Sequence, residues 1–411
     1  MATPLGRRFW SVWLGSAASY LSEGLLFGSL PVLAATLTRD ARLISVTAAL
    51  HQSGWLLLGL VSGVVADTVP RLRIMWLANA VRALTAGTFA ALVGTGHTSL
   101  PLVYGLGFVL GLAAPFFDNA SSAVLPELVR PADFQRANSL TQLALAGAAN
   151  LLGPVLGTAL FVLAPAAPFG LAAVAYALGM LVTMVLSRRE PAPARPDDRP
   201  GSWALLREGL SYLARHRVLR AQAAAVGMVN LVTSGALAVA ILYVLQELHL
   251  PQASYGLVIS SFAVGAIAGG VVTVRLTRRL GERRAVLIAL AAFGLAMIVL
   301  GGLPQLVVSL SAMMLMGFFS MVWNITVNSY RQRVVPLALL GRVTSVFRMA
   351  AFLTMPLGAL LAGLGAHAMG LRWTYVLGGV LLLATAGGAV RPLRGMPNRP
   401  AGDEAEVPST A

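Results

Sequence analysis

Long apolar runs alternate with short polar stretches along almost the entire chain. Each run covers about 19 to 29 residues and can cross the ~30 Å hydrocarbon core of a bilayer as a helix. A polar break near the middle separates six runs from six more, which predicts an all-α membrane protein with twelve transmembrane helices in two six-helix bundles. The predicted spans are 9–37, 43–66, 74–95, 99–121, 139–163, 168–187, 219–246, 253–274, 285–303, 306–328, 343–365 and 371–390.

A short motif occurs once in each half. Gly63 to Arg73 consists of a small residue, an apolar pair and a turn that contains arginines, and Gly270 to Leu280 shows the same pattern half a chain later. Both copies end one apolar run and precede another. Duplication of membrane-length segments in this way is typical of secondary transporters built from two parallel repeats.

We expect the two halves to fold as bundles joined by a polar connection. The stretch 188–202 is rich in Pro, Arg and Asp, which favours a flexible linker. Apolar residues then recur at helical spacing from Trp203 to Leu213, which indicates a helix in the membrane interface or, alternatively, a solvated connector helix. The predicted division is an N-terminal bundle at 1–187, a cytoplasmic linker with an interfacial helix at 188–218, a C-terminal bundle at 219–390 and a disordered cytoplasmic tail at 391–411.

Composition favours a membrane protein over a soluble one. Hydrophobic residues make up 57% of the 411 positions and charged residues 11%, whereas soluble domains contain roughly 45–50% and 25%. The chain has no Cys, which excludes disulfides, thiolate metal sites and cysteine nucleophiles. The five His show no metal-ligand spacing, so we expect no metal and no other cofactor.

The positive charge of the chain is distributed as a topology signal. All 30 basic residues are Arg, and the formal net charge is +15. All but five lie on one side of the twelve-span scheme, in its loops or, for Arg220, at the adjoining end of a span, and the five exceptions are Arg39, Arg42, Arg82, Arg348 and Arg372. The positive-inside rule therefore predicts a multi-pass protein of the cytoplasmic (inner) cell membrane with both termini in the cytoplasm, and nucleic acid is not an expected partner.

Glu23 lies at the centre of the first predicted span, where an ionised carboxylate is most costly. Ser19, Tyr20 and Phe27 share its helical face, which suits a water-filled cavity better than lipid. We interpret Glu23 as the proton-coupling group of a transporter. The alternative is a carboxylate that only forms hydrogen bonds within the bundle.

Asp67 ends the second span at the predicted cytoplasmic surface. A carboxylate at this depth can pair with an arginine or face the N-terminus of a neighbouring helix, and so latch the two halves together on the inside. The alternative is ordinary anchoring of charges at the membrane interface. The predicted cytoplasmic gate comprises Asp67, Arg71, Arg82, Asp118 and Arg348.

Polar and aromatic side chains at helical spacing indicate a cargo-binding wall in several spans. His51 and Trp55 share a face of the second span, and Asn324 lies beside Trp323 and several Met in the tenth. Such side chains adapt to bulky, amphipathic ligands, although the same stripes also serve helix packing. The predicted substrate-binding residues are Tyr20, Phe27, His51, Trp55, Asn230, Trp323 and Asn324.

The repeated motif resembles the loop signature of the major facilitator superfamily, Gly-x-x-x-Asp-Arg-x-Gly-Arg-Arg. Gly63, Asp67 and Arg71 keep its frame, whereas Thr68 replaces the usual Arg and Pro70 the usual Gly. The resemblance implies the fold of that superfamily, with two bundles that give alternating access to a central cavity.

Other stretches resemble exporters of the same superfamily. Residues 153–157 match their Gly-Pro-x-x-Gly motif, and Glu23 corresponds to an acid in the first span of the branch that contains macrolide-efflux and enterobactin-exporter proteins. The resemblance implies export of a small amphipathic molecule, drug- or siderophore-like, by proton antiport. Further stretches similar to that branch are 116–118, 125–129, 136–139, 207–213 and 341–343.

The sequence thus predicts a secondary active transporter, with a metabolite importer of the same fold as the alternative. A membrane-embedded enzyme would need reacting groups, and the chain has neither Gly-x-Ser-x-Gly nor His-Glu-x-x-His. The expected partners are a small-molecule substrate, protons and the lipid bilayer. We expect the chain to act as a monomer.

Reporter fusions test the predicted topology. In the twelve-span scheme, a reporter after His97 lies on the side of the membrane opposite to one after Pro196. The two fusions should therefore give opposite results with alkaline phosphatase and with a cytoplasm-dependent fluorescent protein. The same result from both positions contradicts the scheme.

Overall fold

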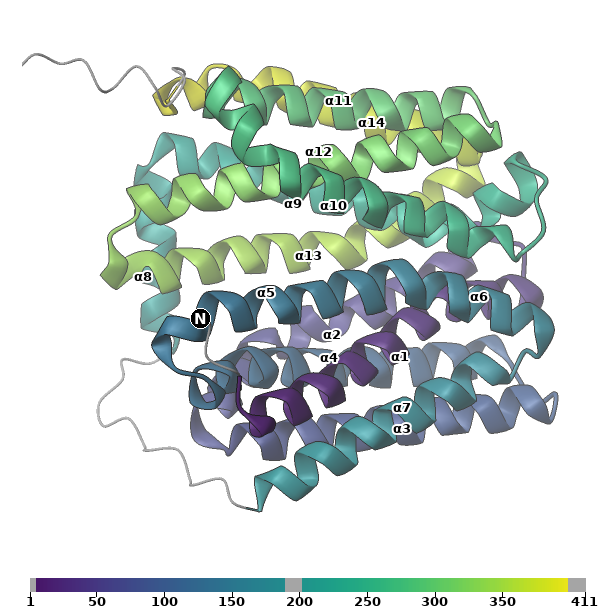
Figure 1. The fold of residues 1–411 in the computed structure, drawn as a ribbon. Coiled ribbons are helices and arrows are strands. Elements are labelled where there is room, and N and C mark those ends of the chain that lie inside the picture. The colour runs from purple at the N-terminus through teal and green to yellow at the C-terminus, as the bar shows by residue number, and fades with distance from the viewer. Residues whose placement is uncertain (1–4, 189–201, 398–411) are drawn as a thin grey trace, which may run out of the picture. The chain divides into compact units, whose positions relative to one another are not determined.

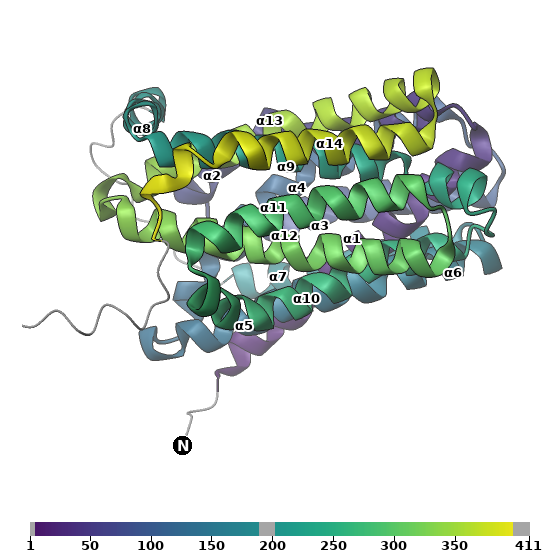
Figure 2. The ribbon, with the colours of Figure 1, turned by 90° about the horizontal axis from the view of Figure 1, so that it is seen from above.

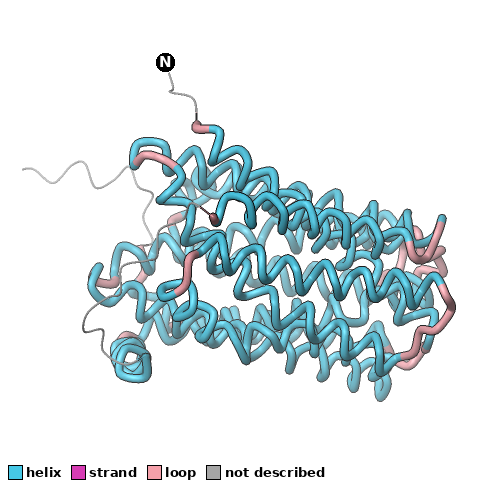
Figure 3. The backbone as a smooth tube through the Cα atoms, turned by 90° about the horizontal axis from the view of Figure 1, so that it is seen from below, coloured by secondary structure: helices cyan, strands magenta, loops and turns pink. Residues whose placement is uncertain are grey.

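The computed structural model of the chain describes residues 5–188 and 202–397, and the regular elements within these ranges are all helices (Figure 3). Eleven helical segments of the described residues are long and apolar enough to cross a membrane. α14 (Leu371–Ala389) covers the twelfth predicted span with 19 residues and a length of about 28 Å. The prediction of an all-α membrane protein is confirmed.

Two compact units make up the chain. The first consists of Met1–Asp197 and Leu237–Ser260, and the second of Asp198–Ala236 and Ser261–Ala411. The border lies at the predicted linker, except that the segment from Leu237 to Ser260 groups with the first half. The linker residues 189–201 lie outside the described part of the chain.

Unit 1 contains the first six predicted spans, whose long helices run side by side (Figure 1 and Figure 2). α5, η2 and α6 follow one another without a break and together cover the fifth predicted span. The elements are α1 (Arg7–Leu37), α2 (Ala41–Thr68), α3 (Arg71–Gly94), α4 (Leu100–Leu128), η1 (Pro131–Asp133), α5 (Phe134–Ala144), η2 (Leu145–Leu152), α6 (Gly153–Leu163) and α7 (Ala167–Ser187).

Unit 2 contains most of the later helices. The last residues of α9, the π-helical turn η3 and the first residues of α10 belong to unit 1 instead. There the Ser260 hydroxyl donates to the Leu151 carbonyl at 2.8 Å, at the end of the π-helix η2. The elements are α8 (Ser202–Arg215), α9 (Arg217–Leu242), η3 (Tyr243–Glu247), α10 (Ser254–Leu280), α11 (Glu282–Gly302), α12 (Leu306–Val334), α13 (Leu337–Met369), α14 and η4 (Pro392–Gly395).

Close helix contacts in both units depend on glycine. A Cβ built on Gly111 of α4 would lie 2.0 Å from the carbonyl oxygen of His51 on α2. In unit 2, a Cβ on Gly317 of α12 would lie 1.9 Å from the carbonyl oxygen of Phe262 on α10. Only glycine allows helices to approach this closely. The two contacts join equivalent helices of the two halves, as expected for an internal repeat.

Glycines four residues apart in the sequence, such as Gly153 and Gly157 or Gly59 and Gly63, do not all serve packing. Gly153 and Gly157 bring α6 against α1, where a Cβ on Gly157 would lie 2.2 Å from the carbonyl oxygen of Leu25. At Gly63, by contrast, an added Cβ would meet no atom within 4 Å. The spacing of glycines therefore predicts a close contact only where the helix face is covered.

The second copy of the repeated motif lies within a helix. α10 continues to Leu280, and the chain turns at Gly281, whose φ of 78° favours glycine. In the first copy the corresponding turn comes directly before Arg71, at the start of α3. The expectation that 270–280 contains the turn is therefore wrong, since arginine is a good helix former and the helix extends by about one more turn.

The start of the predicted disordered tail is ordered. The side chains of Leu393 and Met396 are 1% and 3% exposed, and the Met396 sulfur accepts a hydrogen bond from Gln222 on α9 at 3.5 Å. The prediction of disorder is therefore wrong for 391–397, because two apolar side chains find cover in unit 2. Residues 398–411 lie outside the described part of the chain.

The amphipathic helix predicted after the linker is present as α8, and it packs on α13. A Cβ on Gly209 would lie 2.7 Å from the Arg342 carbonyl oxygen, and Glu208 forms a salt bridge with Arg342. Leu213 is 8% exposed, whereas Leu210 is 48% exposed. The location of α8 in the membrane interface stays a prediction.

The contact between α2 and α4 can be tested with two alanine substitutions on one helix. Gly111→Ala forces the two backbones apart and should destabilise the protein by about 1–3 kcal/mol, measured as a lower midpoint of thermal unfolding in detergent. Gly105→Ala is the matched control, because a Cβ there meets no atom within 4 Å. Equal midpoints for the two variants contradict the described contact.

Candidate functional site

Arg82 is a buried cation in the interior of unit 1. It lies on α3, and its side chain is 2% exposed. The guanidinium carbon lies 5.1 Å from the centre of the Phe117 ring on α4 and 5.6 Å from the centre of the Tyr176 ring on α7. Two aromatic faces stabilise the cation where water is excluded, because the negative face of each ring attracts it.

Two carboxylates and a histidine surround this cation. Glu23 on α1 and Asp118 on α4 both interact electrostatically with Arg82. His51 on α2 interacts electrostatically with Glu23 and with Arg82. We call Glu23, His51, Arg82 and Asp118 the charged cluster. Four helices each contribute one member, so the cluster depends on the packing of the whole unit.

Arg82 forms no direct ion pair with either acid among the described residues. Its Nη1 atom is buried and has no hydrogen-bond partner there. A buried guanidinium normally uses its donors fully. The arrangement therefore leaves one donor of Arg82 open to a ligand, a water molecule or a rearranged carboxylate.

Hydrogen bonds between α1 and α3 fix the position of Arg82. Asn79, one turn before Arg82 on α3, donates from Nδ2 to the Ser19 hydroxyl at 2.9 Å, and Ser19 donates to the Gly15 carbonyl at 3.0 Å. Both Asn79 and Ser19 are fully buried. Gly179 of α7 packs against the same pair, since a Cβ there would lie 2.6 Å from the Ser19 oxygen.

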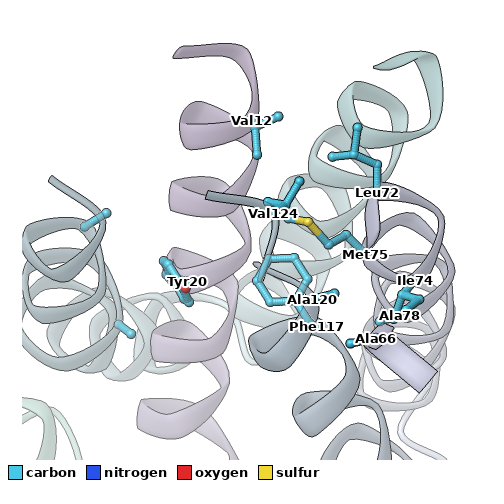
Figure 4. Close-up of a cluster of buried hydrophobic side chains, with 12 residues drawn as sticks. Val12, Tyr20, Ala66, Leu72, Ile74, Met75, Ala78, Phe117, Ala120 and Val124 are labelled. Carbon is cyan, nitrogen blue, oxygen red and sulfur yellow. The ribbon is translucent and has the colours of Figure 1, made fainter. Parts of the chain in front are cut away.

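Tyr20 connects the charged cluster to an apolar core. Its ring meets the Phe117 ring edge to face, with 6.0 Å between the centroids. Val12, Met75 and Val124 belong to the same buried group of side chains from α1, α3 and α4 (Figure 4). The rings of Tyr20 and Phe117 therefore hold α1 and α4 at the spacing that the charged cluster requires.

A narrow pocket of about 20 Å³ leads from the N-terminal end of α1 towards Tyr20. Its polar lining consists of Ser16, Tyr20, Ser121 and Thr141, and Trp13 lies among its apolar residues. A volume of this size holds about one water molecule. The pocket therefore places hydroxyl groups and room for water next to the cluster.

His51 is held at the contact between α2 and α4. Its Nδ1 atom lies 3.3 Å from the Gly107 carbonyl oxygen, and the close approach at Gly111 brings its own backbone against α4. Trp55, one turn later, is half-buried, and Phe27 on α1 is 40% exposed. Of the predicted substrate-binding residues in unit 1, Tyr20 and His51 therefore lie at the charged cluster.

The residues predicted to form one cytoplasmic gate divide into separate groups. Arg82 and Asp118 lie with Glu23, as described above. Arg71, at the start of α3, instead forms a salt bridge with Glu127 near the end of α4, and Asp67 is exposed at the end of α2.

The predicted residues of unit 2 lie on three helices. Asn230 on α9 donates to the Val226 carbonyl of its own helix at 2.8 Å. Trp323 on α12 is 4% exposed, and Asn324 beside it is exposed. Arg348 on α13 is exposed, and its guanidinium carbon lies 5.8 Å from the centre of the Phe352 ring.

Sequence reasoning missed Tyr176, Phe117 and Asn79. A signal existed for Asn79, because it lies at i−3 from Arg82 and therefore shares its helix face. Tyr176 gave no such signal, since its contact with α3 comes only from tertiary packing. Among the described residues, no group of three or more His, Asp or Glu could hold a metal ion.

Membrane-crossing helices in two repeated halves, with a charged cluster enclosed in the first, define a transporter of the major facilitator type. A family model described as a transmembrane secretion effector matches residues 7–405, so the chain belongs to this family of major facilitator transporters. The proteins of this family are transporters rather than enzymes, as the sequence predicted.

Curated relatives agree with this assignment. The enterobactin exporter EntS of Citrobacter koseri is 26% identical over 364 residues, which is 87% of this chain and 85% of that protein. EntS of Shigella boydii is 27% identical over 366 residues with the same coverage. EntS of Salmonella typhimurium is 25% identical over 363 residues, covering 87% of this chain and 86% of that protein.

Solved structures share the fold at low identity. The nucleoside transporter NupG superposes with a TM-score of 0.79 and 11% identity, covering 94% of this chain and 100% of that one. A bacterial homologue of the iron transporter ferroportin, in an inward-facing state, superposes with a TM-score of 0.71 and 18% identity, covering 95% and 98%. Both comparisons confirm the major facilitator fold.

Stability measurements test the charged cluster. Arg82→Gln leaves two carboxylates without their cation and should destabilise the protein by about 3–5 kcal/mol. Adding Glu23→Gln to this variant removes one of these charges and should restore at least about 1 kcal/mol of the lost free energy of unfolding. The control is Arg73→Gln, an exposed arginine on the same helix. Strictly additive effects of Arg82→Gln and Glu23→Gln contradict electrostatic coupling between the two residues.

Proposed function

We propose that this transporter exports a small amphipathic molecule, drug- or siderophore-like, from the cytoplasm in exchange for protons. The direction is supported by the enterobactin exporters, which match the chain over most of their length at 25–27% identity. The Gly-Pro-x-x-Gly motif at 153–157 supports it as well, since these residues form the close contact of α6 with α1. The single observation that carries the coupling is the charged cluster around buried Arg82.

The proposed location is the cytoplasmic membrane, with both termini in the cytoplasm and one chain as the transporting unit. The arginine distribution supports this orientation. Transport proceeds by alternating access, in which a carrier passes through an occluded state between its two open states. Asp67 and Arg71, at the end of α2 and the start of α3, form part of the proposed cytoplasmic gate.

The charge of the cluster provides the coupling. With both carboxylates ionised and His51 neutral, one cation faces two anions and the cluster carries one net negative charge. A net charge is costly in an occluded, low-dielectric cavity, whereas a cluster that has bound one proton is neutral. The empty carrier therefore returns in its protonated form, and export follows the proton gradient.

Glu23 is the proposed proton acceptor. It is half-buried on α1 near the middle of the first span, so it is accessible to water in one state and can be enclosed in another. Binding of cargo displaces the proton from Glu23. Cargo and proton therefore cannot be bound at the same time, as antiport requires.

The pocket beside Tyr20 supplies a route for this proton. Hydroxyls of Ser16, Tyr20 and Ser121 line it, and its other end lies among the first residues of α1, including Phe9. Proton transfer along hydroxyls and water needs such a row of groups that both donate and accept. Tyr20 and His51 also border the space proposed for the cargo.

Transport assays test the role of Glu23. Glu23→Gln keeps the shape of the side chain but cannot titrate, so export of enterobactin or erythromycin driven by a pH gradient should fall to the level of liposomes without protein. Exchange of the same probe across proteoliposomes at equal pH should continue, because it requires no net movement of protons.

The matched control is Glu208→Gln, since Glu208 is an exposed acid that pairs with Arg342 outside the charged cluster and the proposed gate. It should retain export. Uphill transport by Glu23→Gln at the wild-type rate would show that the proton moves elsewhere. Accumulation of the probe in the opposite direction would identify an importer.

A further inference from the structure

Unit 2 contains a second buried cation, Arg331, near the end of α12. Its side chain is 9% exposed, and its guanidinium carbon lies 4.7 Å from the centre of the Phe347 ring on α13. Arg333, two residues later, has a side chain that is 56% exposed and forms a salt bridge with Glu282. Two neighbouring arginines at one helix end thus occupy different environments.

No carboxylate neutralises Arg331 in the described part of unit 2. Residues 202–236 and 261–397 contain two acidic side chains, Glu208 and Glu282. Glu208 pairs with Arg342 and Glu282 with Arg333. Arg331 therefore lies buried with an aromatic ring and an amide as its partners, and a buried cation without an anion is costly.

A row of amides extends from Arg331 along α12. The Nη2 atom of Arg331 donates to the Oδ1 atom of Asn328, and the Nδ2 atom of Asn328 donates to the Oδ1 atom of Asn324 at 2.7 Å. The three residues lie at helical spacing on one face. Asn324 is exposed and Arg331 is buried, so the row leads from an accessible end to an enclosed one.

Both ends of this row present donors. The Nε atom of Arg331 is buried and has no hydrogen-bond partner among the described residues. Asn324 accepts from Asn328 through its oxygen, which leaves its own NH₂ group to donate. A row with N–H groups at both ends and a positive charge at one of them is complementary to an acceptor that carries negative charge.

We propose that Arg331, Asn328 and Asn324 form a subsite for an acidic group of the cargo, a carboxylate or a phenolate. The proposal rests on the proposed transport of a small molecule and names one chemical feature of that molecule. Arg331 binds the anion through its fork of N–H groups, and the asparagines guide it along α12. Phe347 covers the guanidinium when the subsite is empty.

The packing of unit 2 permits access to this subsite. α13, which carries Phe347, packs on α8, α9 and α14, and only slightly on α12. A displacement of α13 relative to α12 uncovers Arg331 without breaking extensive contacts between these two helices. The negative end of the helix dipole also favours a cation in the last turn of α12. Exposed Arg333 already provides that cation, so the dipole does not explain why Arg331 is buried.

Binding of a matched pair of probes tests the subsite. Salicylate and salicylamide have the same ring and hydroxyl, and differ in the charge of one substituent. The full chain in phosphatidylcholine nanodiscs should bind salicylate about tenfold more tightly than salicylamide, measured by isothermal titration calorimetry. Arg331→Gln should remove this preference, and Asn324→Ala should reduce it.

The controls separate charge, geometry and folding. Arg333→Gln should keep the preference, because that arginine pairs with Glu282. Arg331→Lys should restore part of it, since lysine keeps the charge but lacks the fork. An unchanged preference in Arg331→Gln, or equal or absent binding of both probes by the wild type, overturns the proposal.

A lipid phosphate is the other anion that Arg331 could hold. Adding phosphatidylglycerol to the nanodiscs should leave the salicylate preference unchanged if the subsite serves cargo. Loss of the preference in that lipid alone overturns the assignment to cargo. Failure of the subsite and failure of the proposed antiport give different results. If the salicylate preference depends on Arg331 but no probe is transported in response to a proton gradient, the subsite is supported and the antiport function is contradicted.

Discussion

A positive charge enclosed in a bundle of apolar helices is the constraint on which unit 1 depends. Arg82 is almost completely buried, and an isolated charge in such surroundings is too costly to persist. Each neighbouring helix contributes a side chain that stabilises the cation: α4 contributes Phe117 and Asp118, α7 contributes Tyr176, and α1 contributes Glu23. The glycine contacts and the bond between Ser19 and Asn79 bring the helices close enough to do so. This arrangement is the basis of the proposed coupling, in which uptake of one proton changes the net charge of the cluster from negative to neutral.

The two units place their charges differently. Unit 1 encloses two acids with one arginine, whereas the two acids of the described part of unit 2 lie in salt bridges with Arg333 and Arg342. The interior cation of unit 2, Arg331, therefore has no carboxylate partner among the described residues of that unit. The duplicated halves keep equivalent glycine contacts between helices while their polar groups have diverged. This difference between the units is consistent with the two proposed roles: unit 1 binds the coupled proton, and unit 2 recognises an anionic group of the cargo.

Helices were predictable from the sequence because a hydrocarbon core demands apolar runs of a certain length, and each predicted span extends beyond a helical segment of the structure by at most one residue. Glu23 was equally visible, since a carboxylate at the centre of such a run is rare. The grouping of Arg82 and Asp118 with Glu23 was not visible, because it depends on which faces of α1, α3 and α4 meet. Arg331 was counted among cytoplasmic charges, since its burial comes from Phe347 on another helix. The turn placed at 270–280 failed for a local reason: its arginines extend α10 up to Gly281.

Uptake and release of the coupled proton by Glu23 is the step on which the proposed transport depends, and infrared difference spectroscopy can detect it directly. Acidifying the purified protein in lipid should produce the carbonyl stretching band of a protonated carboxylic acid. The wild type and Glu127→Gln should share a component of this band that is missing from Glu23→Gln, and excess exportable cargo should suppress the same component in the wild type. A Glu23→Gln spectrum identical to that of the wild type would show that the coupled proton is carried by another residue.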